Sequence, residues 1–96
     1  MKKGYWVVAY RSVLDESALK EYCKLALPAI EAGGGKILIV STEVEVREAG
    51  IKQRVVVVEF ESLEKALSTY NSDAYQAAVC VLGSAAERDF RIVEGV

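Results

Sequence analysis

The strongest structural signal in this chain is the stretch Arg54-Val55-Val56-Val57-Val58-Glu59-Phe60, in which four consecutive valines stand near an arginine and a glutamate. Consecutive β-branched residues favour an extended strand. Because successive side chains of a strand point to opposite faces of its sheet, this stretch places valines on both faces. It therefore predicts a central strand, from Arg54 to Glu61, that needs apolar cover on each side.

The chain before this stretch predicts a strand, a helix and a second strand. Residues 4–12 are rich in β-branched and aromatic side chains and predict the first strand, and residues 36–40 predict the second. Between them, Asp15 can cap a helix that ends at the three glycines 33–35, and Pro28 predicts a kink within it. The apolar residues of this helix recur at spacings of three and four: Leu19, Tyr22, Cys23, Ala26 and Ile30.

The remaining elements are indicated by alternation and by serine caps. Residues 43–47 alternate valines with charged residues, which predicts a half-exposed continuation of the second strand or an edge hairpin. After the central strand, Ser62 and Ser72 can each cap a helix, with a break near Asn71. Residues 89–94 are again rich in apolar side chains and predict the last strand.

The order of these elements predicts an α+β fold: a ferredoxin-like β-α-β-β-α-β sandwich with an antiparallel four-stranded sheet, built as one domain over residues 1–96. Right-handed crossovers would place the helices on one face of the sheet. The valines of the other face then need cover. A second copy of the chain, packed sheet to sheet, supplies that cover, so the sequence predicts a homodimer.

Composition and charge exclude several classes of partner. The 12 basic residues are scattered among 14 acidic ones, for a net charge of −2, so neither a nucleic-acid surface nor a polybasic membrane patch is expected. No apolar run approaches the ~20 residues of a membrane span, and no signal-peptide pattern is present. These features predict a cytoplasmic protein without a membrane or nucleic-acid partner.

Residue types also limit the chemistry. The chain has no histidine, which excludes imidazole proton relays and histidine-ligated zinc. Cys23 and Cys80 stand far apart on apolar helical stretches, so we expect two buried, small hydrophobic residues rather than a metal site. The sequence calls for no metal and no cofactor.

Five segments carry a resemblance to a known family: Gly4-Tyr5-Trp6, Gly34-Gly35, the strand at residues 54–60, Tyr70-Asn71-Ser72 with Tyr75-Gln76, and Val93-Glu94-Gly95. With these segments the chain resembles, over nearly its whole length, the family catalogued as domain of unknown function 1330 in the dimeric α/β-barrel superfamily. The resemblance implies a ferredoxin-like protomer whose sheet packs against that of its mate to form a barrel. It implies no reaction.

The chain departs from the family pattern at three places. Residues 40–42 read Val-Ser-Thr where relatives carry Arg-Gly-Gly, residues 73–74 read Asp-Ala where they carry Pro-Glu, and Leu82 replaces an arginine. A ligand apparatus that uses those charged positions is therefore incomplete in this chain.

Without histidine, an acid–base site must use carboxylates, phenols or amines. Glu59 interrupts the valine run and is our candidate catalytic base, with Arg54 on the same strand as the anchor of a ligand carboxylate. The structural alternative is an ion pair of Glu59 with Arg54, Arg88, Arg91 or an arginine of a partner subunit.

Tyrosines are the other candidate ligand contacts, because a phenol can orient a carbonyl or phenolic ligand in a cleft between helices and sheet. The candidates are Tyr10, Tyr22, Tyr70 and Tyr75. Such side chains can equally pack in the core with the hydroxyl group at its rim.

Two functions fit this sequence. The first is the binding or transformation of a small carboxylate or aromatic molecule in a cleft between sheet and helices. It requires a cavity of at least ~300 Å³ that contacts two of Glu59, Arg54, Tyr70 and Tyr75. The second is a non-catalytic dimeric structural or accessory module whose sheet surface serves assembly. Fold alone does not choose between them.

Overall fold

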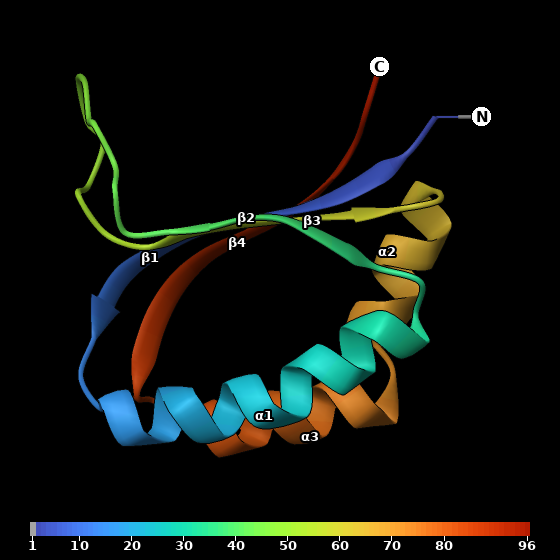
Figure 1. Ribbon diagram of the computed structural model, residues 1–96, viewed down its shortest axis with the longest axis horizontal. Coiled ribbons are helices and arrows are strands. Elements are labelled where there is room, and N and C mark those ends of the chain that lie inside the picture. Colours follow the sequence, from blue (N-terminus) through green and yellow to red (C-terminus); the bar gives the residue numbers. More distant parts are fainter. Residues whose placement is uncertain (1) are drawn as a thin grey trace.

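The protein is described by a computed structural model that covers residues 2–96. Four strands form one antiparallel sheet in the order β2-β3-β1-β4. Figure 1 shows the three helices on one side of this sheet. The elements follow the chain as β1 (Gly4–Val13), α1 (Glu16–Ala32), β2 (Lys36–Ser41), β3 (Val55–Phe60), α2 (Leu63–Tyr70), α3 (Asp73–Leu82) and β4 (Ala86–Glu94). The predicted α+β, ferredoxin-like fold is thereby confirmed.

The predicted helix caps are also confirmed. The Asp15 carboxylate accepts hydrogen bonds from the backbone amides of Ser17 and Ala18, at 3.0 and 3.1 Å. Ser62 and Ser72 cap α2 and α3 in the same way, each accepting from the amide three residues later. Since an unpaired amide at a helix start costs about 1 kcal/mol, these three side chains fix where the helices begin.

The core lies between the sheet and the helices. Trp6 of β1 is 1% exposed, contacts Phe60 and Tyr75 at ring-centroid distances of 4.9 and 4.7 Å, and donates its indole N–H to the Ala66 carbonyl of α2 at 2.9 Å. Tilted aromatic contacts and a satisfied indole donor are favourable in a buried cluster. Trp6 therefore belongs to the core between the sheet and the helices.

The glycines after α1 allow the end of this helix to pack closely against α2 and against the sheet. Gly34 adopts a positive φ of 79°, which favours glycine. Gly33 and Gly35 instead lack room: a methyl group on Gly33 would meet Thr69 of α2, and one on Gly35 would lie 2.6 Å from Ile30 and 2.8 Å from Phe60. The end of α1 can approach α2 and the sheet only because these side chains are missing.

Three local predictions need correction. Residues 43–47 form no strand: β2 is an edge strand that ends at Ser41, and the chain then leaves the sheet until Val55. β4 begins at Ala86, three residues before the predicted start, because its pairing with β1 continues to Val13. Cys80 is exposed rather than buried. Pro28 lies inside α1, which continues as one helix to Ala32, so the helix does not restart at the proline.

The other face of the sheet carries no helix (Figure 1). Its centre is apolar: Val57 of β3 pairs with Val7 of β1 on one side and with Ile39 of β2 on the other. Val7 and Ile39 are 37% and 46% exposed. We call this surface the open face. None of the helices within residues 2–96 is long and apolar enough to cross a membrane.

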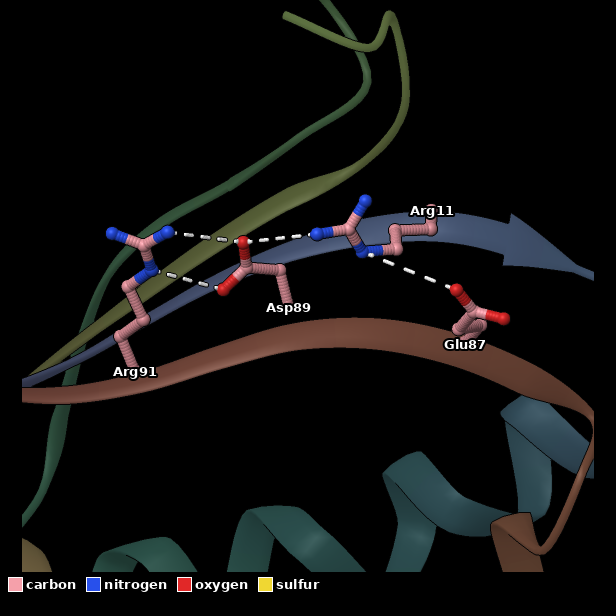
Figure 2. Close-up of polar contacts among 4 residues, drawn as sticks. All are labelled: Arg11, Glu87, Asp89 and Arg91. Atoms are coloured by element: carbon pink, nitrogen blue, oxygen red, sulfur yellow. Dashed lines mark hydrogen bonds and ion pairs between the residues drawn. The ribbon is translucent and has the colours of Figure 1, made fainter.

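Charged residues border the open face where β1 and β4 pair. Asp89 accepts from Arg91, with 3.0 Å between Arg91 Nε and Asp89 Oδ1, and lies 3.5 Å from Arg11 Nη2. Glu87 continues the row, 4.0 Å from Arg11 Nε. Figure 2 shows all four side chains directed away from the helices. The row contains two positive and two negative charges, so it adds no net charge to the open face.

Asp89 should make stability depend on pH. The hydrogen bond from Arg91, then the charges of Arg91 and Arg11, hold the pKa of Asp89 below its ordinary value of 3.8. A lowered folded-state pKa stabilises the fold above the unfolded-state pKa, and this contribution is lost as pH falls through the folded-state pKa. Urea unfolding from pH 7 to 2 should therefore show that Asp89→Asn and Arg91→Gln each remove part of the acid destabilisation seen in the wild type. If the free energy of unfolding of both variants falls at low pH as steeply as that of the wild type, this role of Asp89 is contradicted.

Candidate functional site

A cavity of about 170 Å³ lies between α1 and the sheet. Its walls are apolar and come from α1 and from all four strands. They include Trp6, Val8, Cys23, Ala26, Leu27, Ile30, Ile37, Val40, Val56, Val58 and Phe90. Its polar residues are Tyr10, Tyr22, Arg54, Tyr75 and Arg88. Such a cavity suits an apolar body with one polar head.

Arg88 of β4 is the central polar residue of this cavity. Its Nη1 donates to the Tyr22 hydroxyl at 2.9 Å and to the Tyr75 hydroxyl at 3.4 Å, and those two hydroxyls are 2.5 Å apart. Its guanidinium carbon also lies 4.9 Å from the Tyr22 ring centroid and 5.1 Å from that of Phe90. Aromatic rings and hydroxyls thus hold Arg88 in place, and within residues 2–96 no carboxylate lies within 4.0 Å of it.

The surroundings keep Arg88 charged and keep Tyr22 and Tyr10 protonated. Burial raises the pKa of Tyr22 well above its ordinary value, the neighbouring Tyr75 raises it further, and the charge of Arg88 offsets only part of this shift. Burial is also the main reason why the pKa of Tyr10 is raised. Burial lowers the pKa of Arg88, but its contacts with Tyr22 and Tyr75 raise it by more, to above the ordinary value. At neutral pH this end of the cavity therefore carries positive charge and hydroxyl donors.

The structure gathers four of the six predicted site residues. Tyr10, Tyr22, Tyr75 and Arg54 all line the cavity. Tyr70 does not line it, and packs instead against Trp6 and Phe90, at centroid distances of 6.1 and 5.0 Å. This is the packing role that was the alternative for the tyrosines.

Glu59 lies away from the cavity, so the prediction that it shares one site with Arg54 is wrong. It follows Val58 along β3, and alternation directs its side chain to the open face. There its Oε2 accepts from the Tyr5 hydroxyl at 3.2 Å, and its Oε1 lies 3.9 Å from Lys3 Nζ. The ion pair expected as the alternative thus involves a lysine rather than an arginine. The cavity contacts two of the four named residues, Arg54 and Tyr75, but its volume of about 170 Å³ does not meet the ~300 Å³ that the first function was expected to require. The expectation of a cavity of that size is therefore wrong, and only a short molecule fits.

The sequence prediction missed Arg88 as a cavity residue, because it began the last strand at Asp89. The signal was present in the alternation of Arg88, Phe90 and Ile92, which lie two residues apart on β4. Trp6 and Val8 of β1 pair with Ile92 and Phe90, so this alternation faces the core. Beginning the predicted strand one residue earlier would have included Arg88, which pairs with Tyr10 of β1.

The fold and the cavity together define an α+β protein of the ferredoxin-like class. The sequence model of a family described as domain of unknown function 1330 matches residues 3–96. The chain belongs to this family. No curated protein matches it.

Solved structures share the fold over almost the whole chain. The protein of unknown function RPA0582 from Rhodopseudomonas palustris has a TM-score of 0.73 at 16% identity, with 99% of this chain and 83% of that chain covered. An ethyl tert-butyl ether d family protein from Bacillus halodurans has a TM-score of 0.60 at 15% identity, with all of both chains covered. A nipsnap family protein of unknown function from Agrobacterium tumefaciens has a TM-score of 0.55 at 16% identity, with 98% and 88% covered. At such identities the likeness shows the fold alone.

Proposed function

We propose that this protein is a homodimer that binds a small organic carboxylate in the cavity between α1 and the sheet. The observation that carries this proposal is Arg88: a half-buried guanidinium at the wall of an apolar cavity, held by phenols and within 4.0 Å of no carboxylate of residues 2–96. A guanidinium matches a carboxylate in shape and charge, and the hydrogen bonds between them are stronger than those between neutral groups.

The rest of the cavity supports a ligand with an apolar tail. Ile30, Val56 and Val58 line the walls beyond the arginine, and none of them offers a hydrogen bond from its side chain. Burying an apolar chain against such walls contributes about 0.8 kcal/mol per CH₂ group. A carboxylate head at Arg88 and a short hydrocarbon tail therefore use both parts of the cavity.

The site favours binding over acid–base catalysis. Tyr22 and Tyr10 stay protonated at neutral pH, since burial raises the pKa of both hydroxyl groups. Glu59, our candidate base, lies on the opposite face of the sheet. Proton abstraction requires a base within hydrogen-bond reach of the ligand, and the cavity lining contains no carboxylate or lysine.

The open face supports the homodimer. Its centre at Val7, Val57 and Ile39 is apolar and is not covered by a helix of residues 2–96. The four charged side chains at its border carry no net charge. A two-fold partner would cover the valines with its own valines. Burial of ~500 Å² of apolar surface per subunit would contribute on the order of 12 kcal/mol before the cost of association.

Cell fractionation would test the predicted cytoplasmic location.

Matched ligands test the binding proposal. Hexanoate should raise the melting temperature of the protein and give a measurable heat of binding, because its carboxylate can reach Arg88 while its tail enters the apolar cavity. Hexanamide has the same tail and a neutral head, so it should bind at least about tenfold more weakly. Equal binding of the two, or no binding of either, would contradict the proposal. In the second case the open face would favour the alternative, a non-catalytic assembly module.

A further inference from the structure

Two arginines, not one, face the polar end of the cavity, and they lie in a row across the sheet. Tyr10 of β1 is in the middle: its backbone N–H donates to the Arg54 carbonyl at 3.0 Å on the β3 side, and it pairs with Arg88 on the β4 side. All three side chains line the cavity. The guanidinium carbons of Arg54 and Arg88 lie 5.7 and 5.8 Å from the centroid of the Tyr10 ring.

Neither arginine is neutralised within the described chain. Over residues 2–96, no carboxylate lies within 4.0 Å of the guanidinium of Arg54 or of Arg88, whereas Arg11 and Arg91 both lie within that distance of Asp89. Two like charges on either side of one buried phenol ring repel each other, and a partly buried setting screens that repulsion less than water does. A ligand with a single negative charge can balance only one of them.

We infer that the natural ligand is a dicarboxylate whose two carboxylates stand at the same end of an apolar body, one at Arg88 and one at Arg54, on either side of Tyr10. This inference rests on the proposed function and specifies its ligand class. Neighbouring strands are about 4.8 Å apart, so the backbones of Arg88 on β4 and of Arg54, directly before β3, lie about 10 Å apart on either side of β1. Both guanidinium carbons nevertheless lie close to the Tyr10 ring between them, 5.7 and 5.8 Å from its centroid, so two carboxylates on one carbon atom or on adjacent ones can each meet one arginine. A second carboxylate at the far end of the ligand would instead lie among Ile30, Val56 and Val58.

Three ligands with the same six-carbon chain separate these possibilities at pH 8, where all their carboxyl groups are ionised. Hexanoate has one carboxylate, butylmalonate adds a second at the same end, and adipate adds a second at the opposite end. By calorimetry, butylmalonate should bind at least about tenfold more tightly than hexanoate, because it gains a charge-assisted hydrogen bond to Arg54. Adipate should bind at least about tenfold more weakly than hexanoate, because its second charge enters an apolar space.

The variant Arg54→Gln tests the role of the second arginine. It should bring the affinity for butylmalonate to within about threefold of the affinity for hexanoate measured in the same variant, and circular dichroism should show that the variant is folded. Arg47→Gln removes the same charge from an exposed segment outside the cavity and should keep the full preference for butylmalonate.

Two results would overturn this inference while leaving the proposed function in place: hexanoate and butylmalonate binding equally to the wild type, or Arg54→Gln keeping the preference for butylmalonate. If none of the three ligands binds, the proposed function fails together with this inference.

Discussion

Arg88→Gln should abolish most of the carboxylate binding. Glutamine keeps a hydrogen-bond donor at this position but removes the positive charge, and a hydrogen bond to a charged group contributes about 1.5–3 kcal/mol. The affinity for hexanoate should therefore fall by about 10- to 100-fold, measured by calorimetry at constant ionic strength. Arg88→Lys, which keeps the charge but loses the planar fork of donors, should give an intermediate affinity.

A loss of binding in Arg88→Gln must be separated from a loss of folding, because Arg88 also donates to the hydroxyls of Tyr22 and Tyr75. Removing these bonds should lower the free energy of unfolding by about 1–3 kcal/mol, which urea unfolding would show. Arg91→Gln is the matched control. Arg91 lies on the same strand, but its side chain pairs with Asp89 on the open face, so this variant should bind hexanoate within about twofold of the wild type. A folded Arg88→Gln variant with unchanged affinity would show that the ligand is bound elsewhere.

Val57→Asp should convert the proposed dimer into a monomer. Val57 pairs with Val7 and Ile39, so it lies at the apolar centre of the open face. An aspartate there would be an unpaired charge buried among the apolar side chains of a sheet-to-sheet interface, which costs several kcal/mol. Light scattering coupled to gel filtration should give the mass of a dimer for the wild type and about 10.5 kDa for the variant.

Leu25→Asp provides the control for the dimer. Leu25 is 44% exposed on α1, on the helical side of the molecule, so the same substitution there should leave the dimer mass unchanged. Circular dichroism should show native secondary structure in both variants. A wild-type protein of monomer mass, or a dimeric Val57→Asp variant, would contradict the proposed sheet-to-sheet dimer.

Local sequence patterns were sufficient to predict most of the fold. The valine run identified the central strand, and Asp15, Ser62 and Ser72 marked the helix starts, because a cap requires only one side chain and the adjacent backbone. The alternation at residues 43–47 failed as a predictor. A strand also needs a partner with open hydrogen bonds, and among residues 2–96 no strand lies beside that segment.

The site was harder to predict than the fold because it depends on which face each side chain takes. Glu59 and Val58 are neighbours in sequence, yet one lies on the open face and the other in the cavity wall. Arg54 could be placed from its strand, but Arg88 required knowing that β4 begins at Ala86. A shift of a strand boundary by three residues therefore decided whether the central cation of the site was found.

The missing side chain at Gly35 also bears on which ligands fit. A methyl group added at Gly35 would have the Cγ2 atom of Ile30 as its nearest neighbour, and Ile30 forms part of the cavity wall. The depth available to a ligand is thus set partly by a residue outside the lining. A substitution at Gly35 could therefore change the selectivity of the cavity for the length of the ligand tail without altering Arg54 or Arg88.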